Sequence, residues 1–317
     1  MNEKTLRVVI GAVVALVVLY AVVAMTGRGS SGPASDGDGR ALVAALEAAG
    51  ESGAELIRIV GPADSMELTP GETGWRVNGR PADEGAVRRL LDALAEARVS
   101  HLASDNPENH GRLGVTPDAG WRLEVRHPGG KTRKFVIGNS GPSHPSTYVR
   151  LDEGTEVYVV RGDLGFATRR GLHEWRDRVI VRTDTSAVRE VEVTRDGATY
   201  TFVRGDEGWT LDDKPADAGK IRDMLAELAR LEAVGFVESD DGDAPDVGTV
   251  AAKAVREVVA RDGEGRVLAH VRMAEAGESG SMHTVAEGPA AGQPDVVFEL
   301  STWRADRLAP ARTRAQE

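Results

Sequence analysis

The stretch GETGWRVNGRPADEGAVRRLLDALA (residues 71–95) has a similar copy later in the chain, GDEGWTLDDKPADAGKIRDMLAELA at residues 205–229. The two copies align without a gap at an offset of 134 residues. Both copies place Gly-Trp, then Pro-Ala-Asp, then a stretch rich in Leu and Ala at the same spacing. The repeated positions are those of core and turn residues, and no set of reactive side chains is repeated with them. The pattern therefore predicts two similar units and says little about chemistry.

The likeness extends outward to residues 54–103 and 188–237. Weaker matches continue beyond these ranges and pair Val125 with Val259, Tyr148 with Met282, Val157–Val160 with Val297–Leu300, and Trp175 with Trp303. We therefore expect one unit at residues 54–187 and a second at 188–317. The segment 276–295 is rich in Gly, Pro and Ala and is typical of a mobile loop.

A helix is predicted in each copy after the Pro-Ala-Asp motif. Asp83 and Asp217 are placed as helix N-caps. Apolar residues then recur with a spacing of i, i+3, i+4 and i+7, at Val87, Leu90, Leu91 and Leu94 in the first copy and at Ile221, Met224, Leu225 and Leu228 in the second. Each helix should pack on one face of a sheet, with Trp75 and Trp209 buried between helix and sheet.

Strands are predicted on both sides of each helix. Apolar and polar residues alternate at 55–60, 65–68, 121–126, 133–137, 147–151 and 156–160, and again at 189–194 and 199–203. Asp196-Gly197 suits a hairpin turn between two of these strands. The expected fold class is α+β, with two tandem duplicated units that each contain a mainly antiparallel sheet and a helix on one face.

The N-terminus carries an apolar stretch. Residues 8–25 contain no charged residue and are long enough for a minimal transmembrane helix. Residues 1–7 include Lys4 and Arg7, so the positive-inside rule places the N-terminus in the cytoplasm and the rest outside. A cleaved signal peptide is the alternative. Residues 26–53 would then form a tether and a short juxtamembrane helix.

Charge and cysteine content exclude some functions. The formal net charge of −11 disfavours nucleic-acid binding, because phosphates require a basic surface. The chain contains no cysteine, so disulfides and thiol chemistry are excluded.

Two short motifs resemble functional sequences but fit turns better. Gly130-Lys131-Thr132 resembles the end of a phosphate-binding loop, yet the glycine that should open the loop is Val125 and a strand follows. Arg-Gly-Asp occurs at 161–163 and 204–206, in both cases at a strand end.

Histidines and carboxylates form no evident site in the sequence. The seven histidines are scattered singly, without metal-ligand spacing, and are typical of surface or loop residues. The acidic run 240–246 lacks the spacing of a calcium loop. We therefore predict no catalytic, metal or cofactor-binding residue and no cofactor.

Several motifs together resemble the bacterial "domain of unknown function 4340" family. They are Gly74-Trp75, Pro81-Ala82-Asp83, Ile137-Gly138, Thr147–Arg150, Val157–Val160 and Trp175–Arg178. The resemblance covers nearly the whole chain. It implies a membrane-anchored extracytoplasmic protein, in some members encoded beside components of gliding-type ABC transporters, and it supplies no catalytic residues.

Three classes of function stay open. The first is a non-enzymatic accessory or scaffold protein at the bacterial inner membrane, with an ABC-type permease as partner and contacts at the sheet edges and at loops 105–118 and 238–249. The second is a module that binds peptidoglycan or polysaccharide, which would need exposed tryptophans among Trp75, Trp121, Trp175, Trp209 and Trp303. The third is an unrecognised hydrolase.

Overall fold

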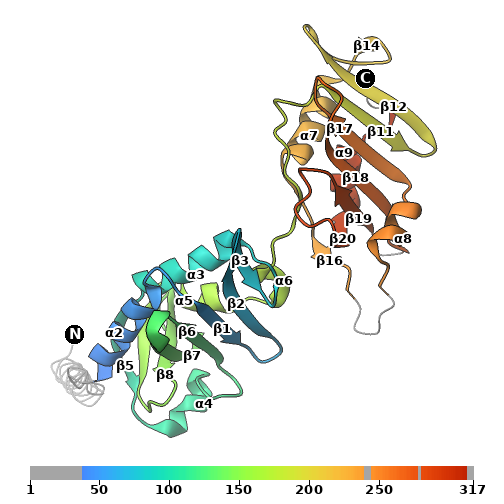
Figure 1. The fold of residues 1–317 in the computed structure, drawn as a ribbon. Helices are drawn as coiled ribbons and strands as arrows, with labels where there is room; N and C mark the ends of the chain where they lie inside the picture. Colours follow the sequence, from blue (N-terminus) through green and yellow to red (C-terminus); the bar gives the residue numbers. More distant parts are fainter. Residues whose placement is uncertain (1–37, 239–243, 278–279, 313–317) are drawn as a thin grey trace, which may run out of the picture. The chain divides into compact units, whose positions relative to one another are not determined.

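The computed structural model describes residues 38–238, 244–277 and 280–312 (Figure 1). The chain divides into two compact units, of which the first ends at Arg176 and the second begins at Asp177. The apolar stretch 8–25 lies outside the described residues. Within those residues, no helix is long and apolar enough to cross a membrane.

Unit 1 contains a sheet of nine strands in which all neighbours are antiparallel. The strands are β1 (Leu56–Val60), β2 (Ser65–Gly71), β3 (Gly74–Val77), β4 (Arg80–Pro81), β5 (Arg98–Ser104), β6 (Trp121–Arg126), β7 (Thr132–Ser140), β8 (Ser146–Leu151) and β9 (Val157–Arg161). Their order across the sheet is β4-β3-β2-β1-β6-β7-β8-β9-β5.

The helices of unit 1 are α2 (Asp38–Gly50), α3 (Glu84–Glu96), α4 (His110–Leu113), α5 (Leu164–Thr168) and α6 (Leu172–Trp175), with 3-10 turns η1 (Pro107–Asn109) and η2 (Pro128–Gly130). The side chain of Asp83 caps α3 by accepting a hydrogen bond from the Ala86 amide, as predicted. Helix α2 packs against α3 (Figure 1). Gly50 permits this close approach, because a Cβ there would lie 2.6 Å from the Ala95 nitrogen.

Unit 2 contains a second antiparallel sheet of nine strands. The strands are β11 (Glu190–Arg195), β12 (Ala198–Gly205), β13 (Gly208–Leu211), β14 (Lys214–Pro215), β16 (Gly235–Phe236), β17 (Arg256–Arg261), β18 (Val267–Glu275), β19 (Ser281–Glu287) and β20 (Phe298–Ser301). Their order is β14-β13-β12-β11-β17-β18-β19-β20-β16. Strands β10 (Val179–Val181) and β15 (Leu231–Glu232) form a separate pair.

The helices of unit 2 are α7 (Ala218–Ala229), α8 (Val247–Ala252) and α9 (Thr302–Leu308). Asp217 caps α7 as predicted, through the Lys220 amide. Asp196 and Gly197 have positive φ angles of 53° and 76° at the β11–β12 hairpin, which confirms the turn expected there. The predicted class, mixed α+β with large antiparallel sheets, is confirmed.

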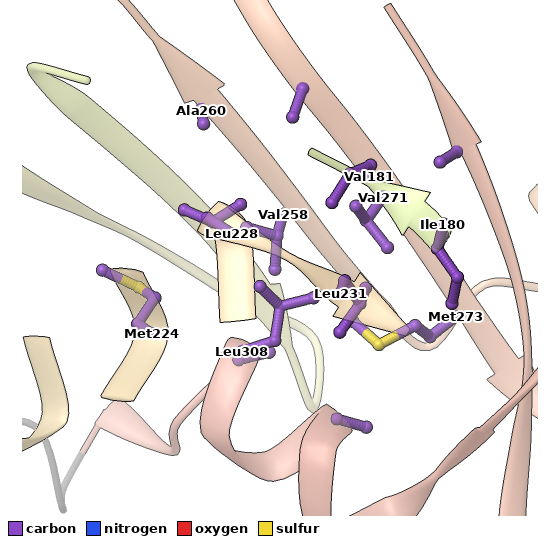
Figure 2. Packing of buried hydrophobic residues seen from close by; sticks show 14 of the residues in the cluster. Ile180, Val181, Met224, Leu228, Leu231, Val258, Ala260, Val271, Met273 and Leu308 are labelled. Atoms are coloured by element: carbon purple, nitrogen blue, oxygen red, sulfur yellow. The ribbon is translucent and has the colours of Figure 1, made fainter. Parts of the chain in front are cut away.

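Each sheet packs its main hydrophobic core against helices on one face. In unit 1 the core includes Leu46 of α2, Leu90 and Leu94 of α3, and Trp175 of α6. In unit 2 it includes Met224 and Leu228 of α7 and Leu308 of α9, which lie over Val258 and Val271 of the sheet (Figure 2). Strands in both units alternate buried and less buried residues, so the opposite face is largely polar.

A small second cluster lies on that opposite face in each unit. In unit 1, Leu113 of α4 packs with Val115, Val136 and Val157. In unit 2, Val250 of α8 packs with Ala274, Val285 and Val297. The described parts of loops 105–118 and 238–249 therefore each hold a short helix on the less covered face of a sheet.

Trp75, Trp209, Leu91 and Leu225 were expected to be buried, and this prediction is wrong. All four are only half-buried and pack at the margin of the main core. For Leu91 the reason is the position of the apolar stripe on the helix. It centres on Ala86, Leu90 and Leu94 in α3, which turns Leu91 toward the edge of the sheet.

The sequence match of Val125 with Val259 is also corrected. Ile57 pairs with Val125 across β1 and β6, whereas Val191 pairs with Ala260 across β11 and β17. Unit 2 therefore has one additional residue before this strand. Because successive side chains of a strand point to opposite faces, the slip of one residue removes Val259 from the main core.

Three further expectations fail. Tyr148 packs in the small second cluster whereas Met282 lies in the main core. Trp175 lies in α6, two helices after the last strand, whereas Trp303 directly follows β20. The segment 276–295, expected to be a mobile loop, contains strand β19, which pairs with both β18 and β20.

Candidate functional site

Two aromatic side chains are largely exposed within the described part of the chain, and they occupy similar places in the two units. Phe166 is 74% exposed and lies in α5, the helix that follows the last strand along the chain in unit 1. Trp303 is 61% exposed and lies in α9, which follows the corresponding strand of unit 2. A single exposed apolar side chain is common on a protein surface, but each of these two rings also lines a pocket.

An arginine one helical turn later stacks on each of these rings. The guanidinium carbon of Arg170 lies 5.2 Å from the centre of the Phe166 ring. That of Arg307 lies 4.6 Å from the centre of the Trp303 ring. Both distances are within the range of cation–π contacts, so each ring is held in place while much of it stays accessible.

A pocket of about 320 Å³ lies beside Trp303. It is lined by Arg195, Lys220, Asp223, Trp303, Asp306, Arg307, Pro310 and Ala311. These residues come from β11, α7, α9 and the segment after α9, so the fold of unit 2 assembles the pocket from distant parts of the sequence.

The pocket wall formed by α7 and α9 is held by ion pairs. Arg307 lies 3.0 Å from Glu227 and 3.4 Å from Asp223, and Arg304 lies 3.6 Å from Glu227. Glu227 is buried at 5% exposure. Burial raises the pKa of its carboxyl group, and the nearby Arg304 and Arg307 oppose this shift.

The segment after α9 is fixed to the sheet. The Tyr200 hydroxyl donates a hydrogen bond to the Pro310 carbonyl, and Arg195 Nη1 donates one to the Ala309 carbonyl at 2.7 Å. Burial raises the pKa of Tyr200 to about 12, so its hydroxyl stays a donor at neutral pH. These contacts hold the Pro310 side of the pocket in a defined position.

A smaller pocket of about 230 Å³ lies beside Phe166. Its polar lining includes His144, Ser146, Asp163 and Arg169. Arg169 donates hydrogen bonds to the Gly138 carbonyl and, at 3.0 Å, to the Thr147 hydroxyl. Burial lowers the pKa of Arg169. Asp163 belongs to the first Arg-Gly-Asp motif, which therefore ends at a pocket.

A polar network lies on the less covered face of the unit 2 sheet. His270 of β18 contacts Glu257 of β17 through Nε2. Arg272 donates to Glu257 at 3.3 Å and to Glu287 of β19 at 2.9 Å. Burial raises the pKa of Glu257, but the hydrogen bonds from His270 and Arg272 outweigh it and lower that pKa overall.

The histidines show no metal-ligand spacing in the sequence, but the fold places His270 beside Glu257 and Glu287. Residues 257, 270 and 287 are far apart in sequence, and only the pairing of β17, β18 and β19 brings them together. The signal in the sequence was the alternation of charged residues along these strands. Within the described residues, no group of three or more histidines and carboxylates is arranged to hold a metal ion.

The other motifs have structural places. Residues 128–130 form the turn η2 before β7, as expected for a hairpin. The second Arg-Gly-Asp motif lies at the β12–β13 hairpin. Of the acidic run, residues 240–243 lie outside the described residues, and Asp246 caps α8 through the Thr249 amide. Of the five tryptophans, Trp303 is largely exposed and Trp175 is fully buried.

A profile for the family described as "Domain of unknown function (DUF4340)" matches residues 75–250. The chain belongs to this family. The match to DUF4340 begins in β3 of unit 1 and ends in α8 of unit 2, so it covers the junction of the two units. No match was found among curated proteins or among solved structures.

Proposed function

We propose that this DUF4340 protein is a non-enzymatic accessory protein that works by contact in an extracytoplasmic complex at the bacterial inner membrane. The observation that carries the proposal is the polar face of each sheet. Opposite its main core, each unit presents alternating exposed charged residues and one short helix, α4 or α8. A charged surface of this kind favours specific contact with an oppositely charged protein surface.

The N-terminal stretch 8–25 supports a single membrane span with the C-terminal units outside. A reporter that is active only outside the cytoplasm, fused after Glu317, should be active in cells. Activity of a cytoplasmic reporter at the same position would reverse this topology. A mature N-terminus near Thr26 would show cleavage of a signal peptide instead.

The proposed partner is an ABC-type permease, as the family resemblance implies. One membrane confines both proteins and raises their effective concentration, so a weak interface suffices. Glu287→Lys reverses a charge on the polar face of unit 2 and should reduce crosslinked co-purification with the permease. Glu264→Lys, at the β17–β18 hairpin end, is the matched control. Equal co-purification of both variants and the wild type would remove this face from the interface.

We further propose that the two units are tandem duplicates. The nine-stranded sheets have corresponding strand orders, β4-β3-β2-β1-β6-β7-β8-β9-β5 in unit 1 and β14-β13-β12-β11-β17-β18-β19-β20-β16 in unit 2. Superposition of experimental structures of the two units should place α3 on α7 and β1 on β11. A fit that matches only isolated hairpins would contradict a common origin.

Binding of an extracytoplasmic polymer, peptidoglycan or polysaccharide, is the second candidate function. Exposed Phe166 and Trp303, each at a pocket, favour it. The full-length protein should co-sediment with purified peptidoglycan, and the double variant Phe166→Ala/Trp303→Ala should not. Val234→Ala removes another exposed apolar side chain and is the control. Co-sedimentation that survives the double variant would exclude these aromatic rings as the contacts.

A further inference from the structure

The pocket beside Trp303 combines an accessible aromatic face with fixed polar groups. Arg307 stacks on the indole at 4.6 Å, and the ring nevertheless stays 61% exposed. A large apolar ring left in water forgoes the stabilisation that burial would give it. A ligand that covers the ring would recover that stabilisation.

Asp306 provides an oriented carboxylate in the pocket lining. Arg195 lies 3.0 Å and Arg256 lies 2.8 Å from the same oxygen of Asp306. Arg195 is in turn fixed by its hydrogen bond to the Ala309 carbonyl. The second carboxylate oxygen can accept hydrogen bonds from ligand hydroxyl groups, and little ordering cost remains because the group is already held.

Lys220 provides a cation that makes no ion pair with any described residue. Arg195 and Arg307 are engaged by Asp306, Asp223 and Glu227. Within the described ranges, in contrast, no carboxylate lies within ion-pair distance of the half-buried Lys220. One uncompensated ammonium group at a pocket favours a ligand that carries a single negative charge.

We propose that this pocket binds one unit of an acidic saccharide, a pyranose that bears a carboxylate. The apolar C–H face of the sugar would stack on the open face of Trp303. Its hydroxyl groups would donate to Asp306, and its carboxylate would pair with Lys220.

The proposal rests on the second candidate function, polymer binding, and names its ligand. The two can fail separately. If short oligosaccharides bind but the protein does not sediment with peptidoglycan, then the pocket is a saccharide site and the polymer assignment is wrong. If the protein sediments with peptidoglycan but neither short oligosaccharide binds, polymer is bound elsewhere and the pocket assignment is wrong.

The test is a titration of the full-length protein with trigalacturonic acid and with neutral maltotriose, followed by calorimetry. We expect trigalacturonic acid to bind more tightly than maltotriose. Trp303→Ala should weaken the binding of trigalacturonic acid by about tenfold or more, since a shift of tenfold corresponds to one good stacking contact. Trp303 is exposed, so this change should leave the fold intact.

Lys220→Gln tests the charge requirement. It should lower the affinity for trigalacturonic acid to that for maltotriose and leave maltotriose unchanged. Lys214→Gln, on an exposed lysine of the β14 edge of the same unit, is the matched control and should change neither. No binding of either sugar, or equal binding by wild type and Trp303→Ala, would overturn the proposal.

Discussion

Unit 1 and unit 2 differ most in the helices that follow the last strand of the chain in each sheet. In unit 1, α5 and α6 follow β9, and Trp175 at the end of α6 is completely buried in the main core. In unit 2, the single helix α9 follows β20 directly, and Trp303 in its first turn is 61% exposed. The same residue type therefore stabilises one unit and forms a surface on the other.

This difference teaches that corresponding strand order does not fix the role of the segments outside the sheet. In unit 1, Trp175 of α6 packs into the main core. In unit 2, Ala305 and Leu308 of α9 pack into the main core instead. Trp303 thereby stays largely exposed.

The largest expected effect is a loss of folding stability when the buried side chain of Trp175 is removed. Trp175→Ala should lower the free energy of unfolding by about 3–5 kcal/mol, because it removes a large side chain from a packed core. Trp303→Ala should change it by less than about 0.5 kcal/mol. Urea unfolding of both full-length variants checks this, and similar losses in the two would contradict the contrast.

The second-largest expected effect is also on folding stability, and it compares Arg150 and Val285, which lie near the small second clusters of unit 1 and unit 2. Arg150 of β8 is buried and donates hydrogen bonds to the carbonyls of Val115, Leu151, Asp152 and Gly154. Val285 of β19 takes the corresponding place in unit 2.

Arg150→Ala should cost about 2–3 kcal/mol, because buried carbonyls lose their donor. Val285→Ala loses only apolar contacts and should cost about 1–2 kcal/mol. Urea unfolding again measures both. A smaller loss for Arg150→Ala than for Val285→Ala would show that water replaces the guanidinium without penalty.

Much of the fold could be predicted because it depends on local patterns. Alternation predicted eight strands, six of them in unit 1, and Asp83 and Asp217 marked the helix starts correctly. The missed elements include strand β5 and helices α4, α5, α6, α8 and α9. Helices α5 and α6 are only five and four residues long, too short for a helical stripe, and β5 pairs with β9 through two irregularities that break alternation.

The candidate sites could not be predicted because they depend on tertiary neighbours. Arg195, Lys220 and Trp303 lie in three separate elements, and no spacing in the sequence connects them. The aromatic–arginine pairs Phe166/Arg170 and Trp303/Arg307 did have a signal, a spacing of four residues, although only the second pair lies within one helix. It becomes informative only once the exposure of the rings is known.

A smaller expected effect is the pH dependence of folding stability that Glu257, on the polar face of the unit 2 sheet, contributes. Folding lowers the pKa of Glu257, so its ionised form is favoured in the folded state. Its contribution to stability is therefore present above the ordinary value of 4.5 and is lost as the pH falls through the lowered pKa.

The stability gap between wild type and Glu257→Gln should be largest near neutral pH, below about 1 kcal/mol for this partly exposed network, and should shrink in acid. Thermal unfolding at several pH values measures it. Glu67→Gln removes the exposed Arg58–Glu67 pair of unit 1 and is the control. A gap that stays constant with pH would show that Glu257 contributes through packing alone.

The smallest effect compares two hairpin turns. Asn78 and Gly79 join β3 and β4 with φ angles of 47° and 78°, whereas Asp212 and Asp213 join β13 and β14 with 51° and 61°. Left-handed backbone costs an L-residue about 1 kcal/mol that glycine avoids, although glycine loses more chain entropy on folding.

The two terms partly cancel, so Asp213→Gly should stabilise unit 2 by about 0.5 kcal/mol and Gly79→Asp should destabilise unit 1 by a similar amount. Chemical unfolding of both variants gives the two values. The two turns differ in their side-chain contacts, since Asn78 bonds to Glu67 and Ser65 whereas Asp212 pairs with Arg312. Changes of the same sign in the two variants would mean that these side chains, and not the backbone, set the preference at this position.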